Sequence, residues 1–309
     1  MSDKIYNQEL VYKSEQKTFK TINSFKVMQK AAKECFLFIQ KKHSFKKALI
    51  LCGPGNNGGD GVLIAKNLIN KKHKVDVHYP FGLPKKADSK KALDIFCKKN
   101  KIKKKIILDE YDLIVDSLFG TGFNKKLDRK KILFFNKINK LKTIKISIDM
   151  PSGVFTDTGE INTIAIRSNF TLSLNRFKVG QWLLPGKEYC GTNILINIGL
   201  ANLDKKSFLQ INRPIFLPSA SLAHNKFTRG ICFLISGENL IGASKLAFFS
   251  ASQATLRAGA GLCKILVNEK NKNFFKTHIL EEMIINYKNN KQFKKIIVME
   301  KCNSVIFGC

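Results

Sequence analysis

Three short stretches of the chain carry most of the residue types that bind ligands or move protons. The first, at residues 53–61, reads Gly-Pro-Gly-Asn-Asn-Gly-Gly-Asp-Gly and follows a short apolar run. Its glycines allow the backbone to approach a ligand closely, and the N–H groups at the start of a following helix favour phosphate oxygens. Because no Gly-Lys-Ser/Thr sequence follows, the stretch predicts a ligand-binding turn that is not a Walker A loop.

The other two stretches supply carboxylates and hydroxyls. Residues 116–123 read Asp-Ser-Leu-Phe-Gly-Thr-Gly-Phe, and residues 147–153 read Ser-Ile-Asp-Met-Pro-Ser-Gly. Each lies where a predicted apolar strand ends, and ligands of open parallel sheets bind at the carboxyl ends of the strands. Each acid taken alone is compatible with capping a helix. Taken together, the three loops predict one site, which contains Asn57, Asp116, Asp149 and Ser152.

The elements that position these stretches alternate between strands and helices. Strands are predicted at 47–52, 74–79, 113–116, 143–149, 168–174 and 193–198, and helices at 59–70, 87–99 and 128–141. A single amphipathic helix, capped by Asn23 or Ser24, precedes them and turns Met28, Ala32 and Ile39 to one face. The alternation indicates an α/β fold, a Rossmann-like three-layer sandwich whose mostly parallel sheet is covered on both faces.

The alternation breaks near residues 211–225, where Pro214 and Pro218 flank a short apolar piece. We place a domain boundary there, between a first domain at 1–215 and a second at 216–309. The second domain is predicted to hold strands at 230–235, 262–267 and 304–309 and a helix at 243–258. Because it is shorter than a typical domain, we expect the chain to be a fragment of a longer protein, or the second domain to be degenerate.

The composition is strongly basic, with 54 Lys and Arg against 23 Asp and Glu, but only six of the basic residues are Arg. Arg is the side chain suited to bidentate recognition of phosphates and bases, and the lysines are spread along the whole chain. We therefore interpret the excess as compositional bias and expect no specific nucleic-acid partner. The eight scattered cysteines fit reduced core thiols. No apolar run reaches transmembrane length and the start lacks a secretory signal, so we expect a cytoplasmic protein without membrane contact; a homo-oligomer is compatible with the sequence.

The three stretches, in this order and spacing, resemble the NAD(P)H-hydrate epimerase family. Residues 27–32 (Val-Met-Gln-Lys-Ala-Ala), 171–174 and 178–180 resemble it too, and the likeness extends over about residues 19–200. The chain departs from the family pattern at Phe177, where proline is usual, and at Ala32, where glycine is usual. The resemblance implies a small-molecule substrate, the 6-hydroxy hydrate of NADH or NADPH, and an isomerase that interconverts its S and R forms in metabolite repair.

The resemblance also implies roles for individual residues. Asp149 is the implied acid–base catalyst, and Asn57, Asp116 and Ser152 are the implied ligands of one potassium ion. The implied substrate contacts are Asn56, Asn57, Gly58, Gly59, Asp60, Gly120, Thr121, Gly122, Phe123, Asn124, Lys125, Lys126, Asp149 and Lys178. The chemistry agrees with an acid–base role, because C6 is a hemiaminal carbon that can lose hydroxide and regain water on either face. No redox step is involved, so no further organic cofactor is implied.

The second domain resembles the opening of the ADP-dependent NAD(P)H-hydrate dehydratase, which has a ribokinase-like fold. The likeness rests on residues 224–230, 234–237, 241–243 and 256–262, and it places Ala243 at a substrate-contacting position. ADP or ATP is implied only for a complete dehydratase domain, and this polypeptide alone is expected to lack that lyase activity. One alternative is a non-catalytic RNA- or protein-binding scaffold, which has no need for both Asp116 and Asp149. The other is a working dehydratase or kinase, which needs a downstream Gly-rich anion hole.

Overall fold

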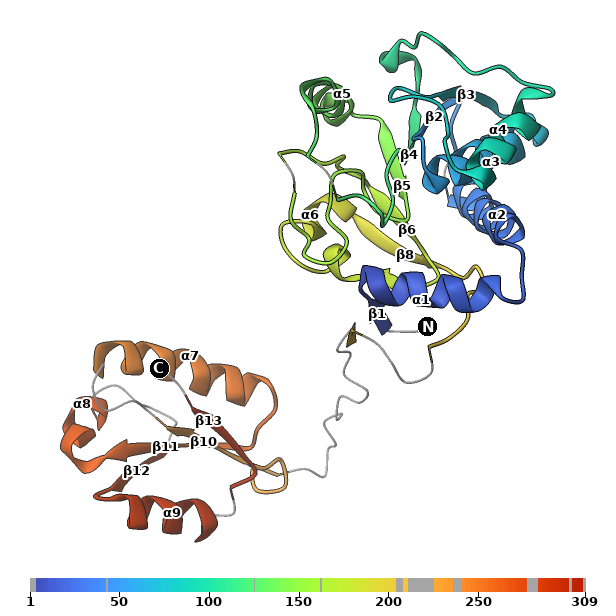
Figure 1. Cartoon of the computed structure of the whole chain (residues 1–309). Helices are drawn as coiled ribbons and strands as arrows, with labels where there is room; N and C mark the ends of the chain where they lie inside the picture. The colour runs from blue at the N-terminus through green and yellow to red at the C-terminus, as the bar shows by residue number, and fades with distance from the viewer. Residues whose placement is uncertain are drawn as a thin grey trace. The chain divides into compact units, whose positions relative to one another are not determined.

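The computed structural model describes residues 4–42, 44–124, 126–161, 163–203, 208–210, 225–235, 241–276, 283–299 and 302–307. The chain divides into two compact units, Met1–Arg213 and Pro214–Cys309, and each unit combines a parallel sheet with helices (Figure 1). The boundary predicted after residue 215 lies outside the described residues. Within the described residues, no helix combines the length and the hydropathy that crossing a membrane requires.

The first unit holds a six-stranded sheet with helices on both faces, in agreement with the predicted α/β sandwich. The strands have the spatial order β3-β2-β4-β5-β6-β8 and pair in parallel throughout. They are β2 (Lys47–Cys52), β3 (Lys74–His78), β4 (Leu113–Ser117), β5 (Ile144–Ile148), β6 (Phe170–Leu174) and β8 (Thr192–Ile196). Helices α2 (Ser24–Lys42), α3 (Asn56–Asn70) and α4 (Ala87–Cys97) cover one face, and α5 (Arg129–Lys140) covers the other (Figure 1).

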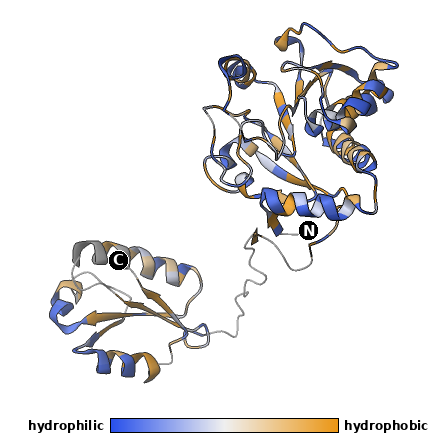
Figure 2. Ribbon diagram, in the orientation of Figure 1, coloured by the Kyte–Doolittle hydropathy of each residue, from blue (hydrophilic) through white to orange (hydrophobic). Residues whose placement is uncertain are grey.

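Strand β2 shows why these residues form a central strand. Ala48, Ile50 and Cys52 point into the core beneath α2, α3 and α4, whereas Leu49 and Leu51 point into the core beneath α5. All five side chains are fully buried, as expected for a parallel strand that is covered on both faces. The strands consist mainly of apolar residues, and polar residues line the outer surfaces of the helices (Figure 2). Because the strands are parallel, the polar residues that come directly after each strand in the sequence gather at the carboxyl edge of the sheet.

The prediction of one opening helix is wrong, because two helices occupy this region. Helix α1 (Gln8–Phe19) ends where the Thr18 carbonyl accepts from the N–H groups of residues 21 and 22. The side chain of Asn23 then accepts from the N–H of Phe25 at 3.0 Å, which is the predicted cap of α2. The apolar periodicity of α2 predicts that helix, whereas the largely polar sequence of α1 gives no periodic signal for a second one.

Helix α3 begins at Asn56, three residues before its predicted start. The segment expected to be a loop is therefore the first turn of a helix, with its N–H groups directed at the sheet edge. This turn packs tightly, since a methyl group on Gly58 would lie 1.9 Å from the carbonyl oxygen of Gly53. A methyl group on Gly53 would in turn lie 1.8 Å from the carbonyl oxygen of Leu118. Glycine is thus required where β2, α3 and the end of β4 approach one another.

A small second sheet, which was not predicted, fastens the N-terminus to the segment after β6. Strand β1 (Lys4–Tyr6) pairs in parallel with β7 (Phe177–Lys178) and antiparallel with β9 (Leu209–Gln210). Tyr6 is aligned with Lys178 in this pairing. Short helices, η2 (Val179–Gln181) and α6 (Lys187–Cys190), follow β7, and η1 (Leu108–Glu110) precedes β4.

The second unit is a four-stranded parallel sheet of order β12-β11-β10-β13. Its elements are β10 (Ile231–Ile235), α7 (Ile241–Arg257), β11 (Leu262–Asn268), η3 (Glu269–Asn271), α8 (Lys272–Lys276), β12 (Met283–Tyr287), α9 (Asn290–Met299) and β13 (Ser304–Phe307). Residues of α7 and α8 pack on one face and residues of α9 on the other. Strands β10, β11 and β13 and helix α7 were predicted, whereas β12, α8 and α9 were not.

We predict that Gly58→Ala lowers the free energy of unfolding by at least about 2 kcal/mol, because the new methyl group meets backbone that cannot move aside. The matched control is Gly55→Ala, where a methyl group meets nothing within 4 Å. This control should cost less than about 1 kcal/mol, the loss of a glycine at an N-cap. Urea unfolding of both variants measures the difference, and equal losses would contradict the role given to Gly58.

Candidate active site

The three predicted loops meet at the carboxyl edge of the first sheet. Asn57 lies in the first turn of α3, Gly120 lies in the loop after β4, and Asp149 follows β5. A methyl group on Gly120 would lie 3.4 Å from Cβ and Cγ of Asn57 and 3.4 Å from Oδ2 of Asp149. The structure therefore brings these three predicted residues together around a position that glycine leaves open.

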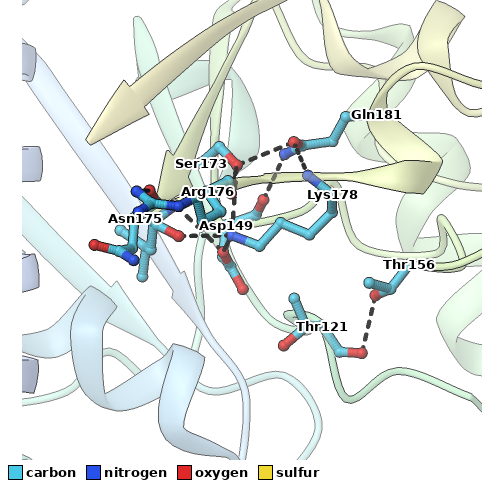
Figure 3. A network of polar contacts seen from close by, with 9 residues as sticks. Thr121, Asp149, Thr156, Ser173, Asn175, Arg176, Lys178 and Gln181 are labelled. Atoms are coloured by element: carbon cyan, nitrogen blue, oxygen red, sulfur yellow. Dashed lines mark hydrogen bonds and ion pairs between the residues drawn. The ribbon is translucent and has the colours of Figure 1, made fainter. Parts of the chain in front are cut away.

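A buried ion pair joins Asp149 to Lys178. The Lys178 ammonium donates to Oδ1 of Asp149 (Figure 3). It also donates to the carbonyl of Leu174 at 2.9 Å. Only 1% of the Lys178 side chain and 13% of the Asp149 side chain are exposed. The N–H of Leu174 also approaches Oδ1 of Asp149, at 3.3 Å. Within the described residues, the hydrogen bonds of this carboxylate thus go to Oδ1, and Oδ2 is the oxygen on the side of Gly120.

Asp116 ties the loop after β5 to the end of β4. Its carboxylate accepts from the N–H and the hydroxyl of Ser152, at 2.8 and 2.6 Å. It also accepts from the hydroxyl of Ser147 at 2.8 Å and from the N–H of Leu118 at 3.2 Å. Burial raises the pKa of Asp116, and these hydrogen bonds oppose the increase. Four hydrogen bonds therefore fix both Asp116 and Ser152 beneath the site.

The side chain of Asn57 is available to a ligand. Its backbone carbonyl accepts from the hydroxyl of Ser117, which fixes the first turn of α3 against β4. Both polar atoms of the side chain, Oδ1 and Nδ2, are buried, and neither has a hydrogen-bond partner among the described residues. A buried amide without partners costs free energy, so a ligand that satisfies it would be stabilised at this position.

The loop after β4 is held at two places. The hydroxyl of Thr156 donates to the carbonyl of Thr121 at 2.9 Å (Figure 3). The ring of Phe123 stacks between Phe119 and Phe155, with centroid distances of 5.1 and 5.6 Å. Three of the predicted substrate contacts in this loop are exposed: Gly122, Asn124 and Lys126. Lys125 lies outside the described residues.

Two further carboxyl groups belong to the surroundings of the ion pair. Burial, and then the charge of Asp149, raises the pKa of Glu15 in α1 to about 6, against the opposing charges of Lys178 and Lys86. Burial also raises the pKa of Asp60 in α3, with the charges of Asp149 and Glu15 acting in the same direction. Three acids and one buried ammonium therefore interact at this edge of the sheet.

The remaining predicted residues are divided between the two units. Gly58, Gly59 and Asp60 are buried in the first turn of α3, and Asn56 is exposed beside them. Ala243 belongs to α7 in the second unit, and its side chain lies outside the described residues.

Sequence reasoning assigned no site role to four residues that the structure places there: Glu15, Ser147, Ser173 and Gln181. Ser147 lies within a predicted strand, where its contact with Asp116 across β4 and β5 depends on the register of the two strands. Gln181 lies three residues after Lys178, so the spacing along a turn could have pointed to it. Glu15 carries no such signal, because it stands in an entirely polar stretch.

Comparisons with known proteins identify the family. Residues 24–180 match the model of the family described as YjeF-related protein N-terminus. The three loops and the Asp149–Lys178 pair lie inside this match, and the chain belongs to this family.

Individual relatives carry more specific names. The NAD(P)H-hydrate epimerase of Limosilactobacillus reuteri is 31% identical over 212 residues, which cover 64% of this chain and 96% of that protein. The bifunctional NAD(P)H-hydrate repair enzyme Nnr of Dictyoglomus turgidum is 32% identical over 264 residues, or 79% of this chain and 50% of that protein. The chain thus spans about half the length of the bifunctional relatives, and the match extends beyond the first unit. A crystal structure of yeast ynu0 shares the fold, with a TM-score of 0.54 at 18% identity over 67% of this chain and 100% of that chain.

We predict that Glu15→Gln stabilises the protein at neutral pH relative to acidic pH. A carboxyl group whose pKa rises from 4.5 to about 6 on folding favours the folded state below pH 4.5 and loses that contribution as the pH rises through 6. Removing the group therefore raises the free energy of unfolding at pH 7.5, relative to pH 4.5, by at most about 2 kcal/mol.

Urea unfolding of the variant and the wild type at both pH values measures this change. The matched control is Glu9→Gln on the same helix, where a hydrogen bond from Lys13, and then its charge, lowers the pKa of an exposed carboxyl and the gain should not occur. A Glu15→Gln variant whose stability follows the wild type at both pH values would contradict the prediction.

Proposed function

We propose that the first unit is an NAD(P)H-hydrate epimerase, which interconverts the S and R forms of the 6-hydroxy hydrates of NADH and NADPH. The observation that carries the proposal is the Asp149–Lys178 pair, whose oxygen Oδ2, without a hydrogen-bond partner among the described residues, lies beside Gly120 at the carboxyl edge of the sheet, next to Asn57. Membership of the family and the likeness to a protein named NAD(P)H-hydrate epimerase over 96% of its length support it.

The reaction needs a group that gives and takes one proton at C6. In the forward half, the Asp149 carboxyl donates a proton to the departing hydroxyl, the C6–O bond breaks with its electron pair on oxygen, and water leaves. The ring nitrogen shares its lone pair with C6, so the ring becomes a flat cation. In the return half, water adds to either face of C6 and gives a proton to the carboxylate. Lys178 holds Oδ1 throughout, which leaves Oδ2 to exchange the proton.

The residues beneath the site fit the potassium ion that the resemblance implies. Asp116 is a fully buried carboxylate that forms no ion pair with any described residue, and an uncompensated buried charge is costly. Oδ1 of Asn57 is buried and has no hydrogen-bond partner among the residues that the structure describes. Together with the Ser152 hydroxyl, these are the hard oxygen donors that such a cation prefers. When bound, the ion would supply positive charge beneath the loops; Asp116, Asn57 and Ser152 would hold it.

The second unit supports no separate activity in this proposal. Relatives that match into it are named bifunctional, and the chain spans half of their length. Dehydration of the S hydrate with ADP or ATP is proposed only for a protein with a complete second domain, where Ala243 would contact the substrate. No observation on the described residues favours the RNA-binding scaffold, and compositional bias remains our interpretation of the lysine excess.

We predict that the protein equilibrates the two hydrates much faster than they interconvert spontaneously, as measured by chromatography that resolves the S and R forms. Asp149→Asn should lower this rate by about 10²-fold or more, the effect of losing an acid–base group. The amide retains an oxygen that can accept from Lys178, so the fold should survive. Asp109→Asn, at an exposed acid in η1, is the matched control and should retain the rate. An unchanged rate in Asp149→Asn would remove this residue from the mechanism.

We predict that potassium chloride raises the unfolding midpoint above that in tetramethylammonium chloride at the same concentration. Potassium at ten times its Kd stabilises the folded state by about 1.4 kcal/mol. Asn57→Leu should abolish the difference, since it removes one proposed ligand. Asn70→Leu, at the exposed opposite end of the same helix, should retain it. Equal midpoints of the wild type in both salts would exclude a stabilising potassium site.

A further inference from the structure

One side-chain amide contacts both members of the buried ion pair. Nε2 of Gln181 donates to the carbonyl oxygen of Asp149 at 2.8 Å, and Oε1 of Gln181 accepts from the N–H of Lys178 at 2.9 Å (Figure 3). Gln181 is fully buried at the end of η2. Because one partner is a carbonyl and the other an N–H, the two contacts also fix which end of the amide is oxygen.

A third residue completes the arrangement. The hydroxyl of Ser173 lies 2.8 Å from the carbonyl oxygen of Arg176 and 3.0 Å from Oε1 of Gln181, so these two acceptors share its one proton. The same hydroxyl lies 3.4 Å from the ammonium nitrogen of Lys178. The amide oxygen of Gln181 therefore faces the N–H of Lys178 and the hydroxyl of Ser173, while the amide nitrogen faces Asp149. Ser173 and Gln181 are both completely buried, so water does not compete for these hydrogen bonds, and a lost partner would leave unpaired groups behind.

The hydrogen bond from Gln181 supports an unusual backbone conformation at Asp149. Its φ of +70° lies in the left-handed region, which a non-glycine residue adopts at a cost of about 1 kcal/mol or more. Two contacts hold this conformation: the N–H of Asp149 donates to the carbonyl of Leu172 at 2.8 Å, and its carbonyl accepts from Gln181. The direction in which the carboxylate leaves the backbone is set by that φ. Without Gln181, the carbonyl of Asp149 would lose this hydrogen bond, and only the N–H of the residue would remain held.

We propose that Gln181 is a positioning residue of the epimerase site. It holds the backbone of Asp149 and the backbone of Lys178 at a fixed separation, so that Oδ1 meets the ammonium and Oδ2 stays directed at the substrate. The inference rests on the proposed function, because the positioned carboxylate is the proposed acid–base group. It adds a residue that acts without touching the substrate.

The test is a double-mutant cycle measured as the rate of hydrate equilibration. Gln181→Met keeps the length of the side chain but lacks both hydrogen bonds, and it should lower kcat by about 10-fold to 100-fold, as for a misplaced reacting group. In an Asp149→Asn background, where no acid–base group remains to be positioned, Gln181→Met should lower the residual rate less than about 2-fold. Gln40→Met, at an exposed position of α2, is the control and should retain the full rate.

Gln181→Glu provides a second variant that separates the two contacts. It keeps an oxygen for the N–H of Lys178 and loses the donor to the carbonyl of Asp149, so it should also slow the reaction. It replaces Gln181→Met in the cycle if unfolding measurements show that the methionine variant is unfolded.

The outcomes separate this inference from the proposal beneath it. A wild type that does not accelerate epimerisation overturns the proposed function and the positioning role with it. An active wild type with full activity in both Gln181 variants overturns the positioning role alone. So does an equal fold-loss in the two Asp149 backgrounds, because general damage to the fold lowers both rates by the same factor.

Discussion

The site depends on one electrostatic constraint: the ammonium of Lys178 is buried, and a buried charge requires a partner. Asp149 provides the counter-charge, and the carbonyl of Leu174 provides a further acceptor. Asp149 follows the end of β5, Leu174 is the last residue of β6 and Lys178 lies just after β6, so the pair forms only when the two strands are in register. That register is set by parallel pairing, with Ile148 opposite Leu172. The sheet thus determines where the reactive carboxylate lies, and the ion pair in turn fastens the segment after β6 to the sheet.

The N-terminal elements complete the surroundings of this pair, although they precede the residues matched by the family model. Strand β1 aligns Tyr6 with Lys178 and so adds a backbone contact on the outer side of β7. Helix α1 then returns across the unit, where the hydroxyl of Ser14 donates to the carbonyl of Ala201 at 2.6 Å. Glu15, the neighbour of Ser14, enters the field of Asp149 in this way. A short strand and a polar helix therefore add a backbone contact and one carboxyl group to the surroundings of a site that the central sheet positions.

The sequence was sufficient for the features that depend on local patterns. Apolar runs such as 47–52 predicted the central strands, and the glycines and acids that follow them predicted where a site would lie, because parallel strands end at a common edge. The features it could not provide depend on long-range contact. Helix α1 buries Val11, Ser14 and Thr18, of which only Val11 is strongly apolar, so no periodic signal marks it. The role of Gln181 depends on a hydrogen bond to a residue 32 positions away. Lys178 was singled out by resemblance alone, and its partner became evident only from the structure.

The charge of the protein acts in two opposite ways on the proposed reaction. A formal net charge of +31 surrounds the molecule with a positive field that attracts the phosphates of a dinucleotide from a distance. At the site itself acidic groups gather: Glu15 and Asp60 interact electrostatically with Asp149, and burial, followed by the charge of Asp149, raises the pKa of both. Loss of hydroxide from the hydrate leaves a positive charge on the ring. The Asp149 carboxylate that remains after the proposed proton transfer stabilises that charge more in the transition state than in the neutral hydrate, which is the differential stabilisation that catalysis of this step requires.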